Sequence, residues 1–393
     1  MLRYGLLALL AAAGAAAVIV IQQHRGSKQA TTTAAPPATQ PLPRVCGGTV
    51  SIGLLAPTTG PSAAIGLDQL HWAQFYVADW NGSHTPRLRI VTADTQGGPK
   101  TAGAAAGKLV ADRAIFGVIG PSGSDDVPAV AATLRTAGLG FVSPSATGDA
   151  LAGGANTGYF FRVVPSERLQ ATTDVDYIAT KLVDKNGSVL VLDDQDGQTA
   201  ALAGTVAAGL RARGVRVARA SVPHGTTNFS GLAAKIGRGT AVVYVPFGSA
   251  GEVEAFAKAL HAARKPAVTF ATDAAYAPGT FDVEGSYLSF FAPDVSTVPV
   301  DQALVATFHQ GFPGPTTAYG APAYVAAQVW AAALHQACVN GGLTRASVRA
   351  LLPTVSLSTS LLGGPVAFTA KGELAAGGFH VFRIVQGKYV TVG

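Results

Sequence analysis

The sequence predicts an α/β protein with two doubly wound, mainly parallel sheets. From Thr49 onward, short apolar runs alternate with longer amphipathic segments, which is the pattern of strands and helices wound into such sheets. The chain has 393 residues, more than the roughly 100 to 200 that one domain usually holds, so we expect two cores. Hydrophobic residues make up 48% of the chain and charged residues 13%, a composition too apolar for disorder.

Residues 1–25 form a predicted signal or membrane anchor. Residues 5–21 are 17 positions without a charged group, which as a helix would cover about 26 Å, the lower edge of a membrane span. We favour an uncleaved anchor over a cleaved secretory signal, because residues 18–21 continue the apolar run beyond the small residues 11–17. Residues 26–47 show no hydrophobic period and are expected to be a disordered tether. This order places the globular part outside the cytoplasm, anchored to the cell membrane, or secreted if the leader is cleaved.

The globular part is expected to alternate strands with helices. The predicted strands are residues 50–55, 88–93, 116–119, 140–143, 189–192, 215–222, 241–245, 267–271 and 287–291. Between the first two strands, apolar residues recur every three or four positions and predict the buried face of a helix: Leu67, Leu70, Ala73, Val77 and Trp80. Asn81 and Gly82 are expected to end this helix.

Turns of small or polar residues follow three of the strands and lead directly into helices. They cover residues 120–125, 193–197 and 246–249. Parallel sheets bind ligands at this carboxyl edge, and helix N-termini there favour an anionic group such as a carboxylate. We therefore expect the functional site at this edge.

The sequence disfavours nucleic-acid binding, enzymatic activity and metal binding. Four of the 28 basic residues precede Asp68, the first acidic residue, so the rest of the chain has 24 basic and 22 acidic residues and no footprint for nucleic acid. Residues 103–108 are one residue short of a phosphate-binding loop, and no serine stands in a Gly-x-Ser-x-Gly turn. The eight histidines show no paired ligand spacing. We predict no enzymatic activity, no cofactor and no metal site.

Several segments, in the same order along the chain, resemble the leucine/isoleucine/valine-binding family of type I periplasmic binding proteins. They are residues 50–61, 116–124, 142–147, 159–165 and 228–230. The resemblance implies the type I periplasmic binding protein fold, in which two lobes joined by a three-segment hinge close around a small-molecule solute. An ABC importer then receives the solute through its permease subunits. A ligand-sensing receptor ectodomain of the same fold is the main alternative, and a cell-envelope protein without a ligand is a third.

The same resemblance implies where the lobes begin and end. The hinge crossings are expected near Arg162, Tyr287 and Leu361. Lobe 1 would then be residues 48–162 plus 288–360, and lobe 2 residues 163–287 plus 361–393. Because each segment after Gly48 can be buried within its own lobe, we expect the chain without residues 1–44 to be a soluble monomer.

The resemblance also implies which residues contact the ligand. Ser124 and Thr147 match the hydroxyls that hold the solute's carboxylate, and Asp273 matches the acid that pairs with its ammonium group. The remaining predicted contacts are Ser122, Gly123, Ser145, Ala146 and Phe247. The alternative roles are structural: Ser124 as a helix cap only, Thr147 as a turn residue only, and Asp273 as a cap of residues 274–277.

The chain departs from the family where aromatic side chains surround the solute. The positions concerned hold Ile65, Asp196 and Gly248–Ser249, although Phe247 and Tyr276 are close in sequence. This leaves a branched-chain amino acid in doubt as the ligand, and Asp196 shifts the expectation toward polar or cationic amino acids and amides.

Cys46 and Cys338 are the only cysteines of the chain. A disulfide is expected between them, because disulfides form outside the cytoplasm, and it would join the start of the first strand to the late helix around residues 324–337, both assigned to lobe 1. Two buried free thiols are the alternative.

Overall fold

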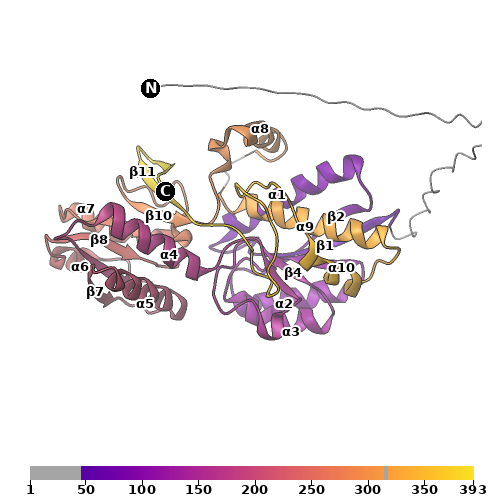
Figure 1. Cartoon of the computed structure of the whole chain (residues 1–393), viewed down its shortest axis with the longest axis horizontal. Helices are drawn as coiled ribbons and strands as arrows, with labels where there is room; N and C mark the ends of the chain where they lie inside the picture. The colour runs from indigo at the N-terminus through magenta and orange to yellow at the C-terminus, as the bar shows by residue number, and fades with distance from the viewer. Residues whose placement is uncertain (1–45, 314–316) are drawn as a thin grey trace, which may run out of the picture. The chain divides into compact units, whose positions relative to one another are not determined.

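The computed structural model describes residues 46–313 and 317–393 (Figure 1). The predicted anchor, residues 1–25, and the predicted tether up to residue 45 lie outside the described residues. Within the described ranges, none of the helices has both the length and the hydropathy needed to cross a membrane.

The first sheet has five parallel strands in the order β2-β1-β3-β4-β5. These strands are β1 (Thr49–Ala56), β2 (Arg87–Asp94), β3 (Ile115–Ile119), β4 (Phe141–Ser143) and β5 (Phe160–Arg162). Helices cover both faces, as the two cores show. One core contains residues of α1 (Ala63–Ser83), α9 (Gly320–Val339) and α10 (Arg345–Leu351). The other contains residues of α2 (Pro99–Ala111) and α3 (Asp126–Thr136).

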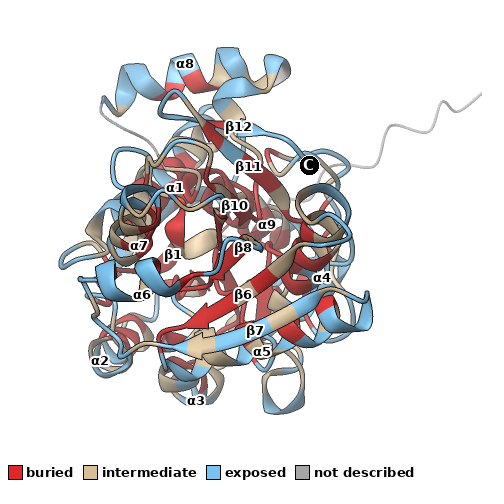
Figure 2. Cartoon of the chain, turned by 90° about the vertical axis from the view of Figure 1, so that its left-hand side faces the viewer, coloured by how far each residue is buried: buried red, intermediate tan, exposed pale blue. Residues whose placement is uncertain are grey.

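The second sheet has seven strands in the order β12-β11-β10-β9-β8-β6-β7. They are β6 (Ser188–Asp193), β7 (Arg216–Ser221), β8 (Thr240–Val245), β9 (Val268–Ala271), β10 (Tyr287–Phe290), β11 (His380–Val385) and β12 (Lys388–Thr391). Only the pairs β10–β11 and β11–β12 are antiparallel. In Figure 2 the central strands are buried and the edge strand β7 is largely exposed.

Helices cover the two faces of the second sheet as well. The core on one face contains residues of α4 (Glu167–Tyr177) and α5 (Gly197–Ala212). The core on the other face contains residues of α7 (Ala250–Ala262) and the short helix α6 (Ser230–Lys235). The remaining helix, α8 (Gln302–Gly311), packs on α1, where Phe308 stacks on Trp72 with ring centroids 4.1 Å apart. Two doubly wound sheets confirm the predicted fold class.

All nine predicted strands are confirmed, with ends that differ by at most one residue. Three strands were not predicted: β5, which has only three residues, and the antiparallel pair β11 and β12. The prediction for the first helix was partly wrong, because α1 continues through Asn81 and Gly82 to Ser83. Ala73 and Val77 are buried as predicted, whereas Leu67 is 38% exposed and Asp68 is only 5% exposed. Asp68 is buried because it accepts hydrogen bonds from the Thr317 backbone and hydroxyl, at 3.0 and 2.7 Å.

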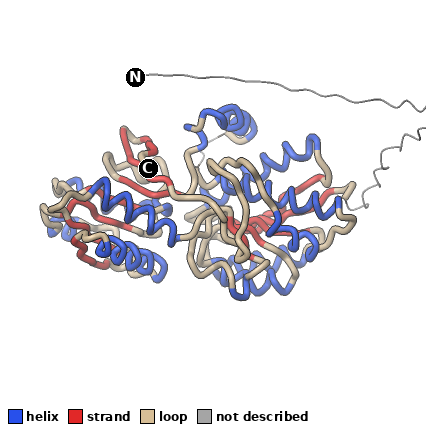
Figure 3. Tube along the Cα trace, in the orientation of Figure 1, coloured by secondary structure: helices blue, strands red, loops and turns tan. Residues whose placement is uncertain are grey.

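The chain passes between the two sheets three times, through the connecting segments that Figure 3 shows as loops. The first passage follows β5, which ends at Arg162. The second, predicted near Tyr287, comes after Phe290, because β10 pairs with β9 and β11. The third comes after Leu361, since Leu361 and Val366 still pack in the core of the first sheet.

The predicted disulfide is present. Cys46 lies just before β1 and Cys338 lies near the end of α9, with Cα atoms 5.6 Å apart and 292 positions between them in sequence. Both side chains are buried. The bond therefore ties the start of the first sheet to the helix that fills much of its core.

Candidate functional site

A cavity of about 480 Å³ lies where strands of both sheets end. On the first sheet, Pro57 follows β1 and Ser122 follows β3 by three residues. On the second sheet, Asp194 follows β6 and Thr272 follows β9. Ligand sites of parallel sheets form at this edge, so the cavity is the candidate solute site.

Six of the eight predicted contact residues line this cavity. They are Ser122, Gly123, Ser124, Ser145, Thr147 and Asp273. Ile65, Asp196 and Gly248, which stand where the resemblance implies aromatic side chains in the family, line it too. Contact with a solute stays a prediction for all of them.

The other two predicted contacts, Ala146 and Phe247, do not line the cavity. Ala146 is fully buried in the core between the first sheet and α3. Phe247 is also fully buried, because it packs against Phe229 and within the same core as Phe256. Tyr276, the other aromatic residue considered, packs against Phe290 with ring centroids 4.4 Å apart. The cavity wall therefore contains little aromatic surface.

Hydrogen bonds to Gln69 of α1 hold the serines of the first wall. The Ser122 hydroxyl donates to Oε1 of Gln69. Nε2 of Gln69 donates to Oγ of Ser145 at 2.9 Å, and the Ser145 hydroxyl donates to the Ser122 carbonyl at 2.8 Å. Because both hydroxyl protons are donated within the wall, the two serines shape it and can offer a solute only their oxygen atoms as hydrogen-bond acceptors.

Ser124 and Thr147 connect neighbouring segments of this wall. Oγ of Ser124 accepts from the Gly148 backbone N–H at 3.1 Å, and no side chain caps the start of α3. The Thr147 carbonyl accepts from the backbone N–H of Glu167 at 2.9 Å, which joins the wall to the start of α4. Ser124 is thus not a helix cap, and Thr147 lies at the first passage between the sheets.

Arg162 lies behind the wall and fixes its position. Its side chain is fully buried, and Nη1 donates to the carbonyls of Ala146 and Gly148 at 3.1 and 2.8 Å. Nε and Nη2 form a bidentate ion pair with Glu373, at 2.6 and 2.7 Å. Planar bidentate pairing of this kind is specific to arginine. Arg162 therefore links the site wall, the end of β5 and the third passage of the chain.

Asp273 lies on the opposite wall, in the short turn after β9. Its Oδ1 accepts from Nε2 of Gln170 at 2.7 Å, and its carbonyl accepts from the Tyr319 hydroxyl at 2.8 Å. No side chain caps the turn that Asp273 begins, so its carboxylate is free of the capping role considered above. Burial raises the pKa of Asp273 to about 6, although the Gln170 hydrogen bond lowers it.

Acidic side chains dominate the cavity. Those that line it are Asp125, Asp126, Glu167, Asp194, Asp196 and Asp273, whereas His224 is the one basic lining residue among the described residues. Burial raises the pKa of Glu167 to about 7. Burial and the neighbouring Asp125 raise the pKa of Asp126 to about 6. This arrangement favours a positively charged solute.

Two acidic residues adjoin the subsite predicted to hold the carboxylate of the solute. Asp125 and Asp126 stand at the start of α3, directly after Ser124. Their negative charge opposes the attraction that the helix N-terminus would have for an anion. A solute carboxylate near Ser124 and Thr147 would therefore meet repulsion as well as hydrogen-bond donors.

The profile of the periplasmic binding protein family matches residues 49–388. The chain belongs to this family. It is an extracytoplasmic solute-binding protein and not an enzyme.

Relatives of this periplasmic binding protein bind more than one kind of solute. The Leu/Ile/Val-binding protein BraC3 of Rhizobium johnstonii is 28% identical over 352 residues, which are 87% of this chain and 93% of that protein. A branched-chain amino acid transporter substrate-binding protein of Streptococcus pneumoniae, solved with isoleucine, has a TM-score of 0.75 at 19% identity and covers 88% of this chain and 100% of its own. An ABC transporter solute-binding protein of Rhodopseudomonas palustris, solved with p-hydroxybenzoic acid, has a TM-score of 0.74 at 17% identity and covers 87% and 95%.

Some lining residues of this periplasmic binding protein were missed from the sequence. Glu167 and His224 are the clearest examples. His224 follows β7 by three residues, so the carboxyl-edge rule could have identified it. Glu167 begins α4 just after a passage between the sheets, and the sequence holds no comparable signal for it.

Proposed function

We propose that this protein captures a small, positively charged solute, such as a cationic amino acid or a related amine, for an ABC importer. The observation that carries the proposal is the cavity lining, with six carboxylic side chains and a single imidazole. The names of the relatives support an ABC permease as the partner that receives the solute. Asp273 binds the positive group of the solute, and Ser124 and Thr147 contact its other end.

The size of the cavity is compatible with such solutes. Pockets for small ligands usually measure about 300 to 1,000 Å³, and this cavity of about 480 Å³ is at the lower end of that range. A charged group that leaves water needs an opposite charge and hydrogen bonds in the site, which the carboxylates of both walls supply. A neutral branched side chain would instead bring apolar surface against these charges.

Ligand-dependent thermal stability tests the proposal. Arginine, lysine, ornithine and a short diamine should raise the melting temperature more than leucine, isoleucine or 4-hydroxybenzoate. At 100 times its dissociation constant, a solute stabilises the folded protein by about 2.7 kcal/mol. We expect Asp273→Asn to remove most of the shift by the best cation, while Asp184→Asn, which changes an exposed acid outside the cavity, retains it.

The effect should depend on pH in a defined direction. Asp126, Glu167 and Asp273 have pKa values raised to about 6, 7 and 6, so they gain protons as the pH falls from 8 to 5. Cation affinity, measured by calorimetry, should therefore fall over this range. Leucine as the tightest ligand, with undiminished binding by Asp273→Asn, would contradict the proposal.

We also propose the two lobes predicted from the sequence as the units that close around the solute. They are residues 48–162 plus 288–360, and 163–287 plus 361–393. Support comes from the cavity, whose lining includes residues that follow strands of both sheets. The passages of the chain after Phe290 and after Val366 suggest that the second and third boundaries lie a few residues later than predicted.

The N-terminal region is proposed to anchor a monomeric globular part to the membrane. Deletion of residues 1–44 should move the protein from the membrane to the soluble fraction, because residues 5–21 hold the long uncharged run. Light scattering after size-exclusion chromatography should give the mass of one chain. Continued sedimentation of the truncated protein with membranes would rule out the anchor.

A further inference from the structure

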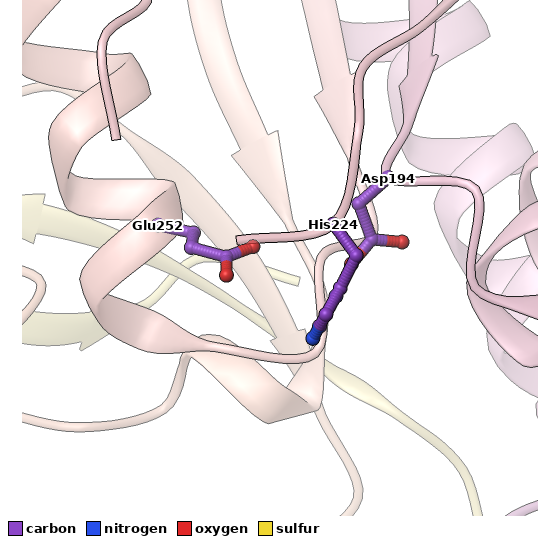
Figure 4. A group of neighbouring side chains, drawn as sticks. All are labelled: Asp194, His224 and Glu252. Carbon is purple, nitrogen blue, oxygen red and sulfur yellow. The ribbon is translucent and has the colours of Figure 1, made fainter. Parts of the chain in front are cut away.

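Three metal-binding side chains lie together beside the cavity. Asp194 follows β6, His224 lies in the loop after β7, and Glu252 lies in the first turn of α7. One donor atom from each lies within 4.8 Å of the other two. Figure 4 shows Glu252 on its helix facing His224 and Asp194. The three residues are far apart in sequence, and the sheet topology brings them together.

We propose that Asp194, His224 and Glu252 bind a divalent transition-metal ion of the Zn²⁺ type. An imidazole nitrogen with two carboxylate oxygens suits Zn²⁺ and its neighbours, whereas Ca²⁺ and Mg²⁺ are bound by oxygen ligands. Three protein ligands leave a fourth position for water or a polar group. The ion takes the place of the proton between Nδ1 of His224 and Oδ2 of Asp194, which are 3.0 Å apart.

Asp194 is the preorganised ligand. Its side chain is only 1% exposed, and Oδ1 accepts hydrogen bonds from the Thr199 hydroxyl and from the Asp196 backbone N–H. Oδ2 is left to face His224. Hydrogen bonds behind a ligating carboxylate orient it in the same way in known metal sites.

The buried carboxylate of Asp194 has only one basic side chain beside it, that of His224, and this side chain is 67% exposed. A bound metal ion would place a fixed positive charge against the carboxylate.

Small movements are enough to complete the site. Zinc bonds to nitrogen and oxygen are about 2.1 Å long, so tetrahedral ligands lie about 3.4 Å apart. Donor atoms at the 4.8 Å limit therefore need to approach by about 1.4 Å, and the pair Nδ1 of His224 and Oδ2 of Asp194, at 3.0 Å, needs to separate by about 0.4 Å. His224 is exposed and Glu252 is partly exposed, so both side chains can move while Asp194 stays fixed.

Glu252 is the one proposed metal ligand that does not also line the solute cavity. Asp194 and His224 also line the cavity, but Glu252 does not. A substitution of Glu252 therefore tests the metal site without removing a cavity residue. The metal proposal does not depend on which solute the cavity takes.

Zinc titration of the full chain tests the proposal. The protein, without a histidine tag, is stripped with EDTA and titrated with ZnCl₂ by calorimetry in the absence of any solute. We expect one ion per chain, and an affinity reduced at least about tenfold by Glu252→Gln and by His224→Gln. The control His261→Gln changes an exposed histidine at the other end of α7 and should leave the affinity unchanged.

Binding of Co²⁺ gives a second readout, since the visible absorption of the bound ion reports the number and symmetry of its ligands. Circular dichroism checks that each variant is folded. The proposal is overturned if the wild-type chain binds no Zn²⁺ at 100 μM, if Glu252→Gln and His224→Gln bind as tightly as wild type, or if Ca²⁺ competes equally. Glu252→Gln should keep the cation-induced thermal shift. Zinc binding without any such shift would support the metal site and reject the proposed solute.

Discussion

Replacement of Arg162 by methionine is expected to lower the free energy of unfolding by about 3 to 5 kcal/mol, the cost of breaking a buried ion pair from one side. The guanidinium is fully buried and bonds both oxygens of Glu373 as well as two carbonyls of the site wall. Methionine has a similar length but no donor, so these acceptors lose their partners. Urea denaturation followed by circular dichroism measures the change.

Two further variants make the Arg162 prediction specific. Arg168→Met removes an arginine that is 80% exposed and lies 3.8 Å from Asp149, so it should cost less than about 1 kcal/mol. The double variant Arg162→Met, Glu373→Leu should recover part of the loss, because no unpaired charge remains. A loss below about 1 kcal/mol for Arg162→Met alone would show that the pair does not support the wall.

Removal of the Cys46–Cys338 disulfide should cost up to about 5 kcal/mol. The bond closes a loop of 292 positions, and so long a loop restricts the unfolded chain strongly. The variant Cys46→Ala, Cys338→Ala should therefore unfold at a lower urea concentration than the oxidised wild type. Both thiol positions are buried, and alanine adds no polar group there.

Reduction provides the matched control for the disulfide. Dithiothreitol should lower the midpoint of wild-type unfolding toward that of the double variant and should not affect the double variant itself. Titration of denatured, unreduced wild type should find no free thiol. Two titratable thiols, or equal midpoints for the oxidised and reduced protein, would contradict the prediction.

The order of strands and most of the cavity could be predicted from the sequence, because both depend on local patterns. Short apolar runs end at the sheet edge that carries the cavity, and Ser124 and Asp273, which the family resemblance implied as ligand contacts, both line it. The direction of a side chain depends instead on tertiary packing. Phe247 lies next to cavity residues in sequence, but its ring fills the core beneath α7.

The same dependence on tertiary packing explains why the predicted buried face of α1 was partly wrong and why the cluster beside the cavity was not predicted. Spacing alone predicted a buried Leu67, whereas Asp68 is the buried residue because a partner 249 positions away satisfies its carboxylate. Asp194, His224 and Glu252 have no common spacing, so no sequence motif could group them. Only the order of β6, β7 and β8 in the sheet brings their loops together.

The disulfide also determines how the molecule responds to mechanical force. Cys46 lies three positions before β1, which pairs with β2 on one side and β3 on the other. Tension applied to the chain before Cys46 therefore divides at this residue, with one path along the backbone into β1 and the other through the sulfur atoms into α9. A long buried helix thus shares the load with the strand that begins the solute site.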